Sequence, residues 1–532
     1  MKQIIIILTL ISVITYSCKK LDLNKISTAG TWNPNIAVPL AFGEFDVYDI
    51  LARTDSSDLV VIDEQTGKLA LVYSGEYLAV QAKDILELGD YSDGYNVDAG
   101  DLSISSSPSF TGSANESFNE TFSVNPGGGN EIHAVIFNQG QLRVTVNSTF
   151  NHNVNVTVVF PGMIKNGSPV TFDFTLSGSS NDVNTINLSG VEFDLSMGGS
   201  SFNTFEVETE MSVSGTGGAI SGNESVDIDF EMQNIDYTSV FGYFGQLEKP
   251  FKDSIQIKIF NQVIDGTFKF TDPKVNMEIM NSFGIPMNIE LDELKTIVEE
   301  TGQEIPLQGY PSPVNINKPA TPGDVSTTLI NLDKSNTSNM ESIVAPAPRY
   351  FYYDSKINLN PSGPSSDLNF IKNSSELVVR GEIELPLKGY AYGFSIRDTF
   401  DFNVGDDLED ADAIEYVMFR LNIDNGFPVD VDGQVIFLDE NHNPVFSAFD
   451  DQEDLAVSAL TDNSGKVTES TKKITDILLE RDEIELLNQV KYFELIGFGE
   501  TKNGTQEEIV RIFDEYKIKL RLGVQIEAKQ SF

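Results

Sequence analysis

The chain has 532 residues, of which 40% are hydrophobic and 22% charged, and its formal net charge at pH 7 is −45. This hydrophobic fraction is typical of folded domains rather than disordered chains, and the length predicts two to four domains. The acidic excess disfavours nucleic acid and anionic lipid surfaces as partners. A single cysteine excludes an intrachain disulfide and a four-cysteine metal site.

The first 18 residues have the pattern of an export signal. Lys2 precedes an almost unbroken apolar run over residues 4–14, and the only cysteine, Cys18, follows shortly after that run. A positive start, an apolar core of about 7–15 residues and small residues before a cleavage point are typical of a secretory signal. The run is shorter than the roughly 20 apolar residues of a membrane span.

With Cys18 at the cut site, this segment resembles the lipobox of bacterial lipoproteins. The resemblance implies that residues 1–17 are a signal peptide, that the Cys18 thiol is acylated, and that residues 18–31 form a polar tether. Lys19 and Lys20 stand where the family places an inner-membrane retention signal, which implies the outer membrane, with the leaflet left open. An ordinary signal peptide with an incidental cysteine is the alternative.

From residue 32 onward, apolar and polar residues alternate in short runs bounded by Gly, Asn and Asp. Period-2 alternation predicts half-buried antiparallel strands, whereas the strands of parallel sheets are apolar on both faces. The fold class expected is therefore all-β, with tandem antiparallel β-sandwich-like domains and one or two short helices. The clearest runs place apolar residues at 142, 144 and 146; 154, 156 and 158; 170, 172 and 174; 275, 277 and 279; and at even positions over 516–526.

The expected division gives an N-terminal β domain over 32–175, a middle β domain over 176–304 and a C-terminal β domain with a short helix over 324–532. Residues 305–323 contain five prolines and predict a linker or an edge segment. Trp32, the only tryptophan, is expected to pack on the first domain.

One unit recurs along the chain as strand, Asn-centred turn, aromatic, proline and strand. It occurs over 275–291 and 417–431, with a weaker copy over 142–160, and its turns are 130 (281 − 151) and 144 (425 − 281) residues apart. This spacing is a typical domain size. The unit resembles the β-sandwich domains of the late-embryogenesis-abundant type 2 family over about 20 residues per copy, which implies a sandwich around each copy.

Three shorter elements are also predicted. Residues 43–51 read as one or two helical turns, and residues 59–63 and 68–73 as a hairpin around 65–67. The best helix follows a capping box of Asp482 and Glu485, with Leu486, Leu487 and Val490 on its apolar side. An earlier start of this helix, near Thr471, is the alternative.

No catalytic pattern emerges from the residues that usually carry chemistry. The three histidines, His133, His152 and His442, are scattered singly, so they are predicted to be surface or turn residues rather than metal ligands. The glycine cluster at 126–130 leads into a strand, not the helix that a phosphate loop needs. Eighty acidic residues leave a catalytic carboxylate pair open without locating it.

Calcium is the one cofactor that the acidic residues suggest. Residues 439–450 place Asp439, Asn441, Asn443 and Asp450 at positions 1, 3, 5 and 12 of a calcium-loop pattern, but Pro444 replaces the glycine at position 6. A hairpin turn is therefore favoured there. The acidic loop 406–412 is a second weak Ca²⁺ candidate, and no catalytic, cofactor-binding or metal-binding residue is assigned.

These observations favour a non-enzymatic, outer-membrane-anchored surface lipoprotein that acts as a binding or structural module for an unknown extracellular or periplasmic partner. The membrane is its second partner, through Cys18. The alternatives are a carbohydrate-binding or carbohydrate-processing lipoprotein and a lipid-carrying β protein. Thirty-five phenylalanines beside one tryptophan favour core packing over sugar stacking.

Overall fold

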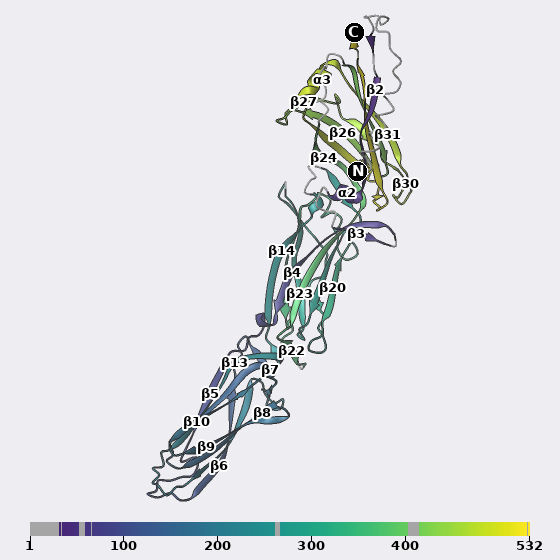
Figure 1. Cartoon of the computed structure of the whole chain (residues 1–532). Coiled ribbons are helices and arrows are strands. Elements are labelled where there is room, and N and C mark those ends of the chain that lie inside the picture. The colour runs from purple at the N-terminus through teal and green to yellow at the C-terminus, as the bar shows by residue number, and fades with distance from the viewer. Residues whose placement is uncertain are drawn as a thin grey trace.

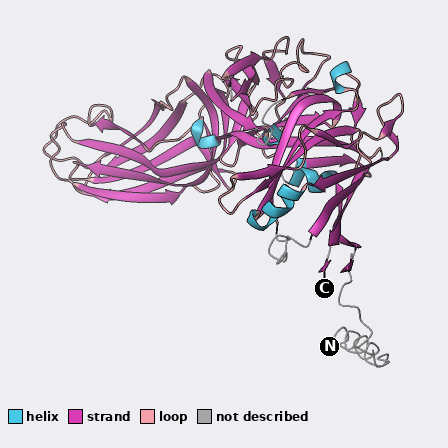
Figure 2. Cartoon of the chain, turned by 90° about the horizontal axis from the view of Figure 1, so that it is seen from above, coloured by secondary structure: helices cyan, strands magenta, loops and turns pink. Residues whose placement is uncertain are grey.

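The computed structural model describes residues 31–32, 35–52, 59–64, 66–260, 266–299, 301–365, 367–402, 414–528 and 530–531. These residues form an all-β fold in which strands pair antiparallel and helices are short, which confirms the predicted fold class (Figure 2). Figure 1 shows three β-sandwiches in a row. We name them the terminal, middle and distal sandwiches, in order away from the strands nearest the two chain ends.

The distal sandwich consists of the sheets β6-β12-β8-β9 and β10-β7-β13-β5, and β11 pairs with both β7 and β8. Phe230 of β13 reaches across to the other sheet, with ring centroids 4.8 Å from Phe122 and 5.6 Å from Phe160. The strands are β5 (Tyr91–Asp98), β6 (Ser113–Ser123), β7 (Asn130–Ser148), β8 (Asn153–Lys165), β9 (Ser168–Ser177), β10 (Ser180–Asn187), β11 (Glu192–Asp194), β12 (Thr204–Ser214) and β13 (Ser225–Phe244).

The middle sandwich packs the sheet β20-β16-β23-β4-β3 against the sheet β14-β21-β17-β18, with β19 also on β17. Tyr77 and Tyr353 meet between the sheets, with ring centroids 4.7 Å apart. The strands are β3 (Val60–Asp63), β4 (Lys68–Gln81), β14 (Leu247–Gln256), β16 (Lys274–Asn281), β17 (Met287–Val298), β18 (Gln303–Pro306), β19 (Val314–Ile316), β20 (Ser326–Leu332), β21 (Tyr350–Leu359) and β23 (Glu376–Pro386). Strand β22 (Asn369–Lys372) pairs with β13 and joins the middle and distal sandwiches.

The terminal sandwich packs the sheet β2-β34-β25-β31 against β15-β24-β32-β26-β27, with β28 on β26 and β33 on β24, around a core that includes Phe402, Phe419 and Phe437. Its elements are β1 (Thr31–Trp32), β2 (Asn35–Asp46), α2 (Val47–Ala52), β15 (Thr267–Phe270), β24 (Lys388–Asp401), β25 (Ile414–Asn425), β26 (Val429–Leu438), β27 (Pro444–Ser447), β28 (Glu453–Ala456), β29 (Leu460–Thr461), β30 (Val467–Glu469), β31 (Thr471–Leu479), α3 (Arg481–Leu486), β32 (Tyr492–Thr501), β33 (Val510–Arg511), β34 (Lys517–Ala528) and β35 (Gln530–Ser531).

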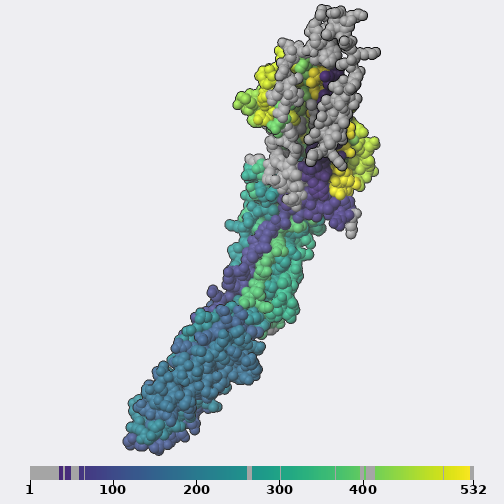
Figure 3. Space-filling view, viewed as in Figure 1, coloured from purple at the N-terminus to yellow at the C-terminus, as the bar shows by residue number. Residues whose placement is uncertain are grey.

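The three sandwiches are nested in the sequence rather than consecutive. Strand β2 pairs with β34, β4 pairs with β23, and the distal strands β5–β13 are continuous between them. The chain therefore leaves the terminal sandwich, crosses the middle one, builds the distal one and returns. In Figure 3 the first described residues (purple) and the last (yellow) accordingly lie together at one end of the molecule.

Strand pairing thus divides the chain differently from the expected order. The strands expected in one domain over 32–175 belong to all three sandwiches, and the expected boundary at 175/176 falls within β9 of the distal sandwich. Local alternation marks strands but carries no information on which distant strand each one pairs with. Within the proline-rich segment 305–323, the strands β18 and β19 both pair with β17 at the edge of a sheet, which corresponds to the edge-segment alternative.

The predictions of single elements agree with the structure more closely than the predicted division into domains. The hairpin β3–β4 is confirmed. Of the helical turns predicted over 43–51, the structure has α2 from Val47 onward, whereas residues 43–46 belong to strand β2. A helix is present near 482, but its N-cap is Glu480, whose N–H donates to the Glu483 carboxylate at 2.8 Å. Within α3 the buried residue is Ile484, whereas Leu487 and Val490 are buried beyond the end of the helix at Leu486. The segment from Thr471 is the strand β31 rather than helix. Strand β1 contains Trp32, whose side-chain packing lies outside the described residues.

Candidate functional site

A cleft of about 750 Å³ lies at the junction of the middle and terminal sandwiches. The edge hairpin β3–β4 and strand β23 contribute one side of this junction cleft, and β33 contributes the other. Its apolar wall includes Val61, Leu69, Leu387 and Ile512. Val61 is 52% exposed although it lies in a strand, so this wall is open to a ligand.

Charged side chains of both signs line the junction cleft. The cations are Lys68, Lys274, Lys334, Lys388 and Arg511. The carboxylates are Asp63, Asp272, Asp333, Glu382 and Glu384. The whole chain has 35 basic and 80 acidic residues, so the balanced lining of five and five makes the cleft far less acidic than the molecule around it.

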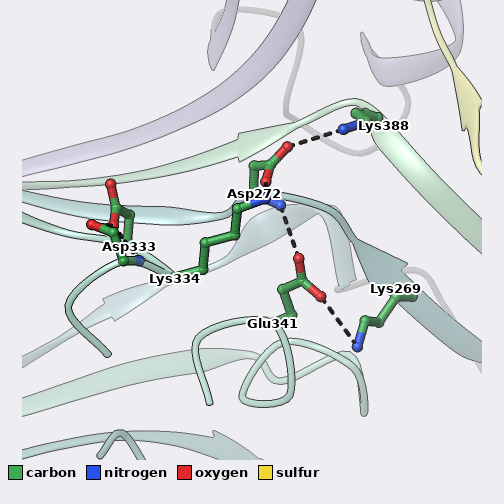
Figure 4. A network of polar contacts seen from close by, with 7 residues as sticks. Lys269, Asp272, Asp333, Lys334, Glu341 and Lys388 are labelled. Atoms are coloured by element: carbon green, nitrogen blue, oxygen red, sulfur yellow. Dashed lines mark hydrogen bonds and ion pairs between the residues drawn. The ribbon is translucent and has the colours of Figure 1, made fainter. Parts of the chain in front are cut away.

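Asp272 lies at the centre of the polar network in Figure 4. It occupies the turn between β15 and β16, and its carboxylate contacts the Nζ atoms of Lys334 and, at 3.0 Å, of Lys388. Hydrogen bonds from Lys334 and then Lys388 outweigh partial burial and hold the pKa of Asp272 below its ordinary value of 3.8. Glu341 extends the network to Lys269 through an ion pair of 3.4 Å.

Other carboxylates of the junction cleft are also engaged. Glu384 accepts a hydrogen bond from the Lys274 Nζ at 2.8 Å, and Glu382 accepts one from the Asn276 amide at 3.2 Å. Asp333 accepts bonds from the hydroxyl and backbone N–H of Ser335, which lower its pKa. The oxygens of these carboxylates are thus already engaged as hydrogen-bond acceptors, which suits charge pairing within the cleft.

Arg511 differs from the other cations of the cleft. It pairs in the β24–β33 ladder with Lys388, so two cationic residues lie side by side. Its Nε is buried and has no hydrogen-bond partner among the described residues. Lys68 also lies near Arg511, because it forms an isolated β-bridge with Phe513, two residues after Arg511 in the chain. No spacing pattern in the sequence indicated these cleft cations, because the five residues come from five distant segments of the chain.

A second hollow, of about 670 Å³, lies on the outer face of the sheet β2-β34-β25, with Gly523 among its lining residues. Phe42 is 64% exposed there, and the Arg521 guanidinium carbon lies 5.6 Å from its ring centroid. Arg420 forms a two-pronged ion pair with Asp476, with both N–O distances 2.6 Å. Both arginines of this hollow are thus already paired or stacked, which makes the hollow a weaker candidate site than the junction cleft.

The histidines predicted as surface or turn residues have different environments. His442 is in the β26–β27 turn and stacks on Tyr492, with ring centroids 4.3 Å apart. His133 is half-buried in β7. His152 lies in the turn between β7 and β8, which is one of the two predicted placements, and it is fully buried there. Its Nδ1 accepts the Thr216 N–H at 3.2 Å, and Phe110 packs on its ring.

The favoured hairpin turn at Asp439 is confirmed, because β26 and β27 pair on either side of it. The Asp439 carboxylate accepts the backbone N–H groups of Asn441 and Asn443, both at 2.8 Å. No cluster of three or more potential metal ligands occurs among the described residues. Cys18 and the acidic loop 406–412 lie outside those residues. No helix within them is long and apolar enough to cross a membrane.

Comparisons with known proteins give no family. No protein-family model and no curated protein matches the chain. Among solved structures, a candidate secreted protein from Parabacteroides distasonis is 11% identical, with a TM-score of 0.29 over 92% of this chain and 99% of that one. The exported protein XepA of PBSX is 9% identical, with a TM-score of 0.14 over 55% of this chain and 86% of that one. Scores this low carry no argument about fold or function.

Proposed function

We propose that this protein is a non-enzymatic lipoprotein, anchored to the outer membrane through Cys18, that acts as a binding or structural module for a partner outside the cell or in the periplasm. The observation that carries the proposal is the pairing of β1 with β35 and of β2 with β34. Because both ends of the described chain lie in the terminal sandwich, an anchor upstream of β1 would leave the middle and distal sandwiches pointing away from it.

The length of the tether fits this arrangement. Thr31 is thirteen residue steps (31 − 18) beyond Cys18, so the tether spans at most about 45 Å when fully extended. The terminal sandwich would then stay close to the bilayer. The junction cleft, with its paired charges and open apolar wall, would be presented between the first and second sandwiches.

The lipid-carrier alternative has less support. The apolar cavities inside the middle and distal sandwiches measure about 10 and about 120 Å³. Sites for drug-sized ligands measure about 300–1,000 Å³, so neither cavity has the size of a lipid lumen. The carbohydrate alternative gains no specific observation from the described residues.

The anchor is tested by expressing the full chain and its Cys18→Ser variant in a diderm bacterium. We expect the natural chain to fractionate with the outer membrane and its mature N-terminus to carry acyl mass. The variant should lack acyl chains and leave the outer-membrane fraction. Ser17→Ala keeps a small residue before the cut and is the matched control. An unaltered mass and location for Cys18→Ser would overturn the proposal.

The leaflet is tested by adding a protease to intact cells. If the module faces the outside, the turns at the far end of the distal sandwich, such as 215–224, should be cut without lysis. If it faces the periplasm, cleavage should appear only after the outer membrane is opened. Mass spectrometry of the released peptides distinguishes the two outcomes.

A further inference from the structure

Arg511 has an unmet hydrogen-bonding capacity at the edge of the junction cleft. Its guanidinium forms no hydrogen bond or ion pair with the described residues, and its Nε is buried. Buried polar groups in folded proteins are almost always hydrogen-bonded, to protein, water or ligand. The side chain therefore has a donor edge that needs an acceptor from outside the chain.

The charges around Arg511 indicate the sign of that acceptor. Lys388, its register partner, shares the single carboxylate of Asp272 with Lys334. Glu384 and Glu382 are taken by Lys274 and Asn276. The Asp272 carboxylate is thus shared by Lys334 and Lys388 and forms no hydrogen bond with Arg511 among the described residues, so an added anion is favoured beside Arg511.

We propose that the junction cleft binds a small organic anion whose carboxylate or phosphate group pairs with Arg511 while its apolar part lies on the wall formed by Val61, Leu387 and Ile512. The planar guanidinium fork matches the two oxygens of such a group. The cleft volume of about 750 Å³ lies within the usual range for small-molecule sites. The inference rests on the proposed role as a binding module and names its ligand class.

The chain's charge of −45 does not exclude an anionic ligand. At physiological ionic strength the Debye length is about 8 Å, so exposed carboxylates beyond that distance are largely screened. The contacts within the cleft decide the affinity, and the distant charge mainly slows association.

Calorimetric titration of residues 19–532, which retain every described residue, tests the proposal. The probes are hexanoate, inorganic phosphate and the neutral hexanol. We expect saturable binding of at least one anion and much weaker binding of hexanol. Hexanoate binding would indicate a carboxylate amphiphile, and phosphate binding a phosphate-bearing ligand.

The substitution series identifies the group that binds. Arg511→Gln should weaken anion binding at least tenfold, and Arg511→Lys, which keeps the charge but loses the fork, should weaken it less. Arg143→Gln, on the exposed surface of the distal sandwich, is the matched control and should leave affinity unchanged. Affinity for the anions unchanged in Arg511→Gln, or no anion binding below about 10 mM, would overturn the proposal.

A second measurement needs no variant. Phenylglyoxal should label Arg511 in the natural chain, and the bound anion should protect it, as read by peptide mass spectrometry. Labelling that the anion does not slow would count against the site even if Arg511→Gln failed to fold. Neither assay involves the lipid, so failure here leaves the Cys18 anchor standing, and loss of the anchor leaves these assays unchanged.

Discussion

The loops that join the two sheets of the middle and the terminal sandwich share one hydrogen-bond pattern. In the middle sandwich, Asn281 Oδ1 accepts the Phe283 N–H at 2.9 Å, and its Nδ2 donates to the Asn317 carbonyl at 3.0 Å. In the terminal sandwich, Asn425 Oδ1 accepts the Phe427 N–H, also at 2.9 Å. Its Nδ2 donates to two backbone carbonyls, at 2.8 and 3.0 Å. Each loop is an arch between sheets, because its two strands lie in different sheets.

The distal sandwich uses a reduced version of the same arch between β7 and β8. There Ser148 Oγ accepts the Phe150 N–H at 3.2 Å. The serine side chain lacks the amide NH2 group through which the two asparagines donate to a second segment. Phe150 and Phe283 are fully buried and Phe427 is 7% exposed. In all three arches the polar residue stabilises the turn and the aromatic ring fills the core. The asparagines of the middle and terminal arches add a second contact, here called the clasp, in which the side-chain amide donates to a carbonyl of another segment.

The aromatic should matter most. Phe283→Ala should lower the free energy of unfolding by about 3–5 kcal/mol, because it leaves a cavity in a packed core. Phe427→Ala should cost somewhat less, since its ring is already partly exposed. Urea unfolding followed by circular dichroism measures both. Phe202→Ala, at a site 44% exposed, is the control and should change stability by less than about 0.5 kcal/mol.

The clasp should come second. Asn281→Ala removes two hydrogen bonds and leaves buried groups unpaired, for a loss of about 2–3 kcal/mol, whereas Ser148→Ala removes one bond and should cost about 1 kcal/mol. Asn281→Asp separates the two hydrogen bonds, because it keeps the acceptor for the Phe283 N–H but loses the donor to the Asn317 carbonyl. Equal losses for the Asn281 and Ser148 alanine variants, in the same urea experiment, would show that the clasp contributes nothing.

Much of this local order could be predicted from the sequence. Apolar alternation located the buried faces, since Val144, Val156 and Ile279 are all 1% exposed or less. The asparagine units at 281 and 425 were recognised as well, although their role as arches was not, and the copy predicted around Asn151 is built on Ser148 instead. Around α3 several acidic residues, including Glu480, Asp482 and Glu483, are each acceptable near an N-cap, so the cap was placed two residues late.

The nesting and the junction cleft could not be predicted. Strand β2 pairs with β34 from the other end of the chain, and nothing within either segment identifies its partner. Likewise Asp272, Lys388 and Arg511 meet only because β15 and β33 both pair with β24. A site assembled from separate strands leaves no spacing pattern in the sequence, unlike a motif held on one helix or loop.

The smallest effects should come from two carboxylates whose pKa values shift in opposite directions. Lys334 and Lys388 lower the pKa of Asp272, whereas burial, and then Asp227 and Glu231, raise that of Asp229 in the distal sandwich. Ionised Asp272 stabilises the folded chain above the unfolded pKa of about 3.9, and this stabilisation is lost as pH falls through the lower pKa that Asp272 has in the folded chain. The cost from Asp229 is absent at low pH and develops as pH rises through its raised folded value.

At neutral pH, Asp272→Asn should therefore destabilise the chain and Asp229→Asn should stabilise it, each by less than about 1 kcal/mol because solvent screens both groups. As pH falls, the Asp229 difference should vanish below the unfolded pKa of about 3.9, whereas the Asp272 difference should vanish only below the lower folded pKa of Asp272. Urea midpoints measured across that range test the signs directly. If Asp272→Asn were neutral at pH 7, the contacts of Asp272 with Lys334 and Lys388 would contribute nothing to the stability of the fold.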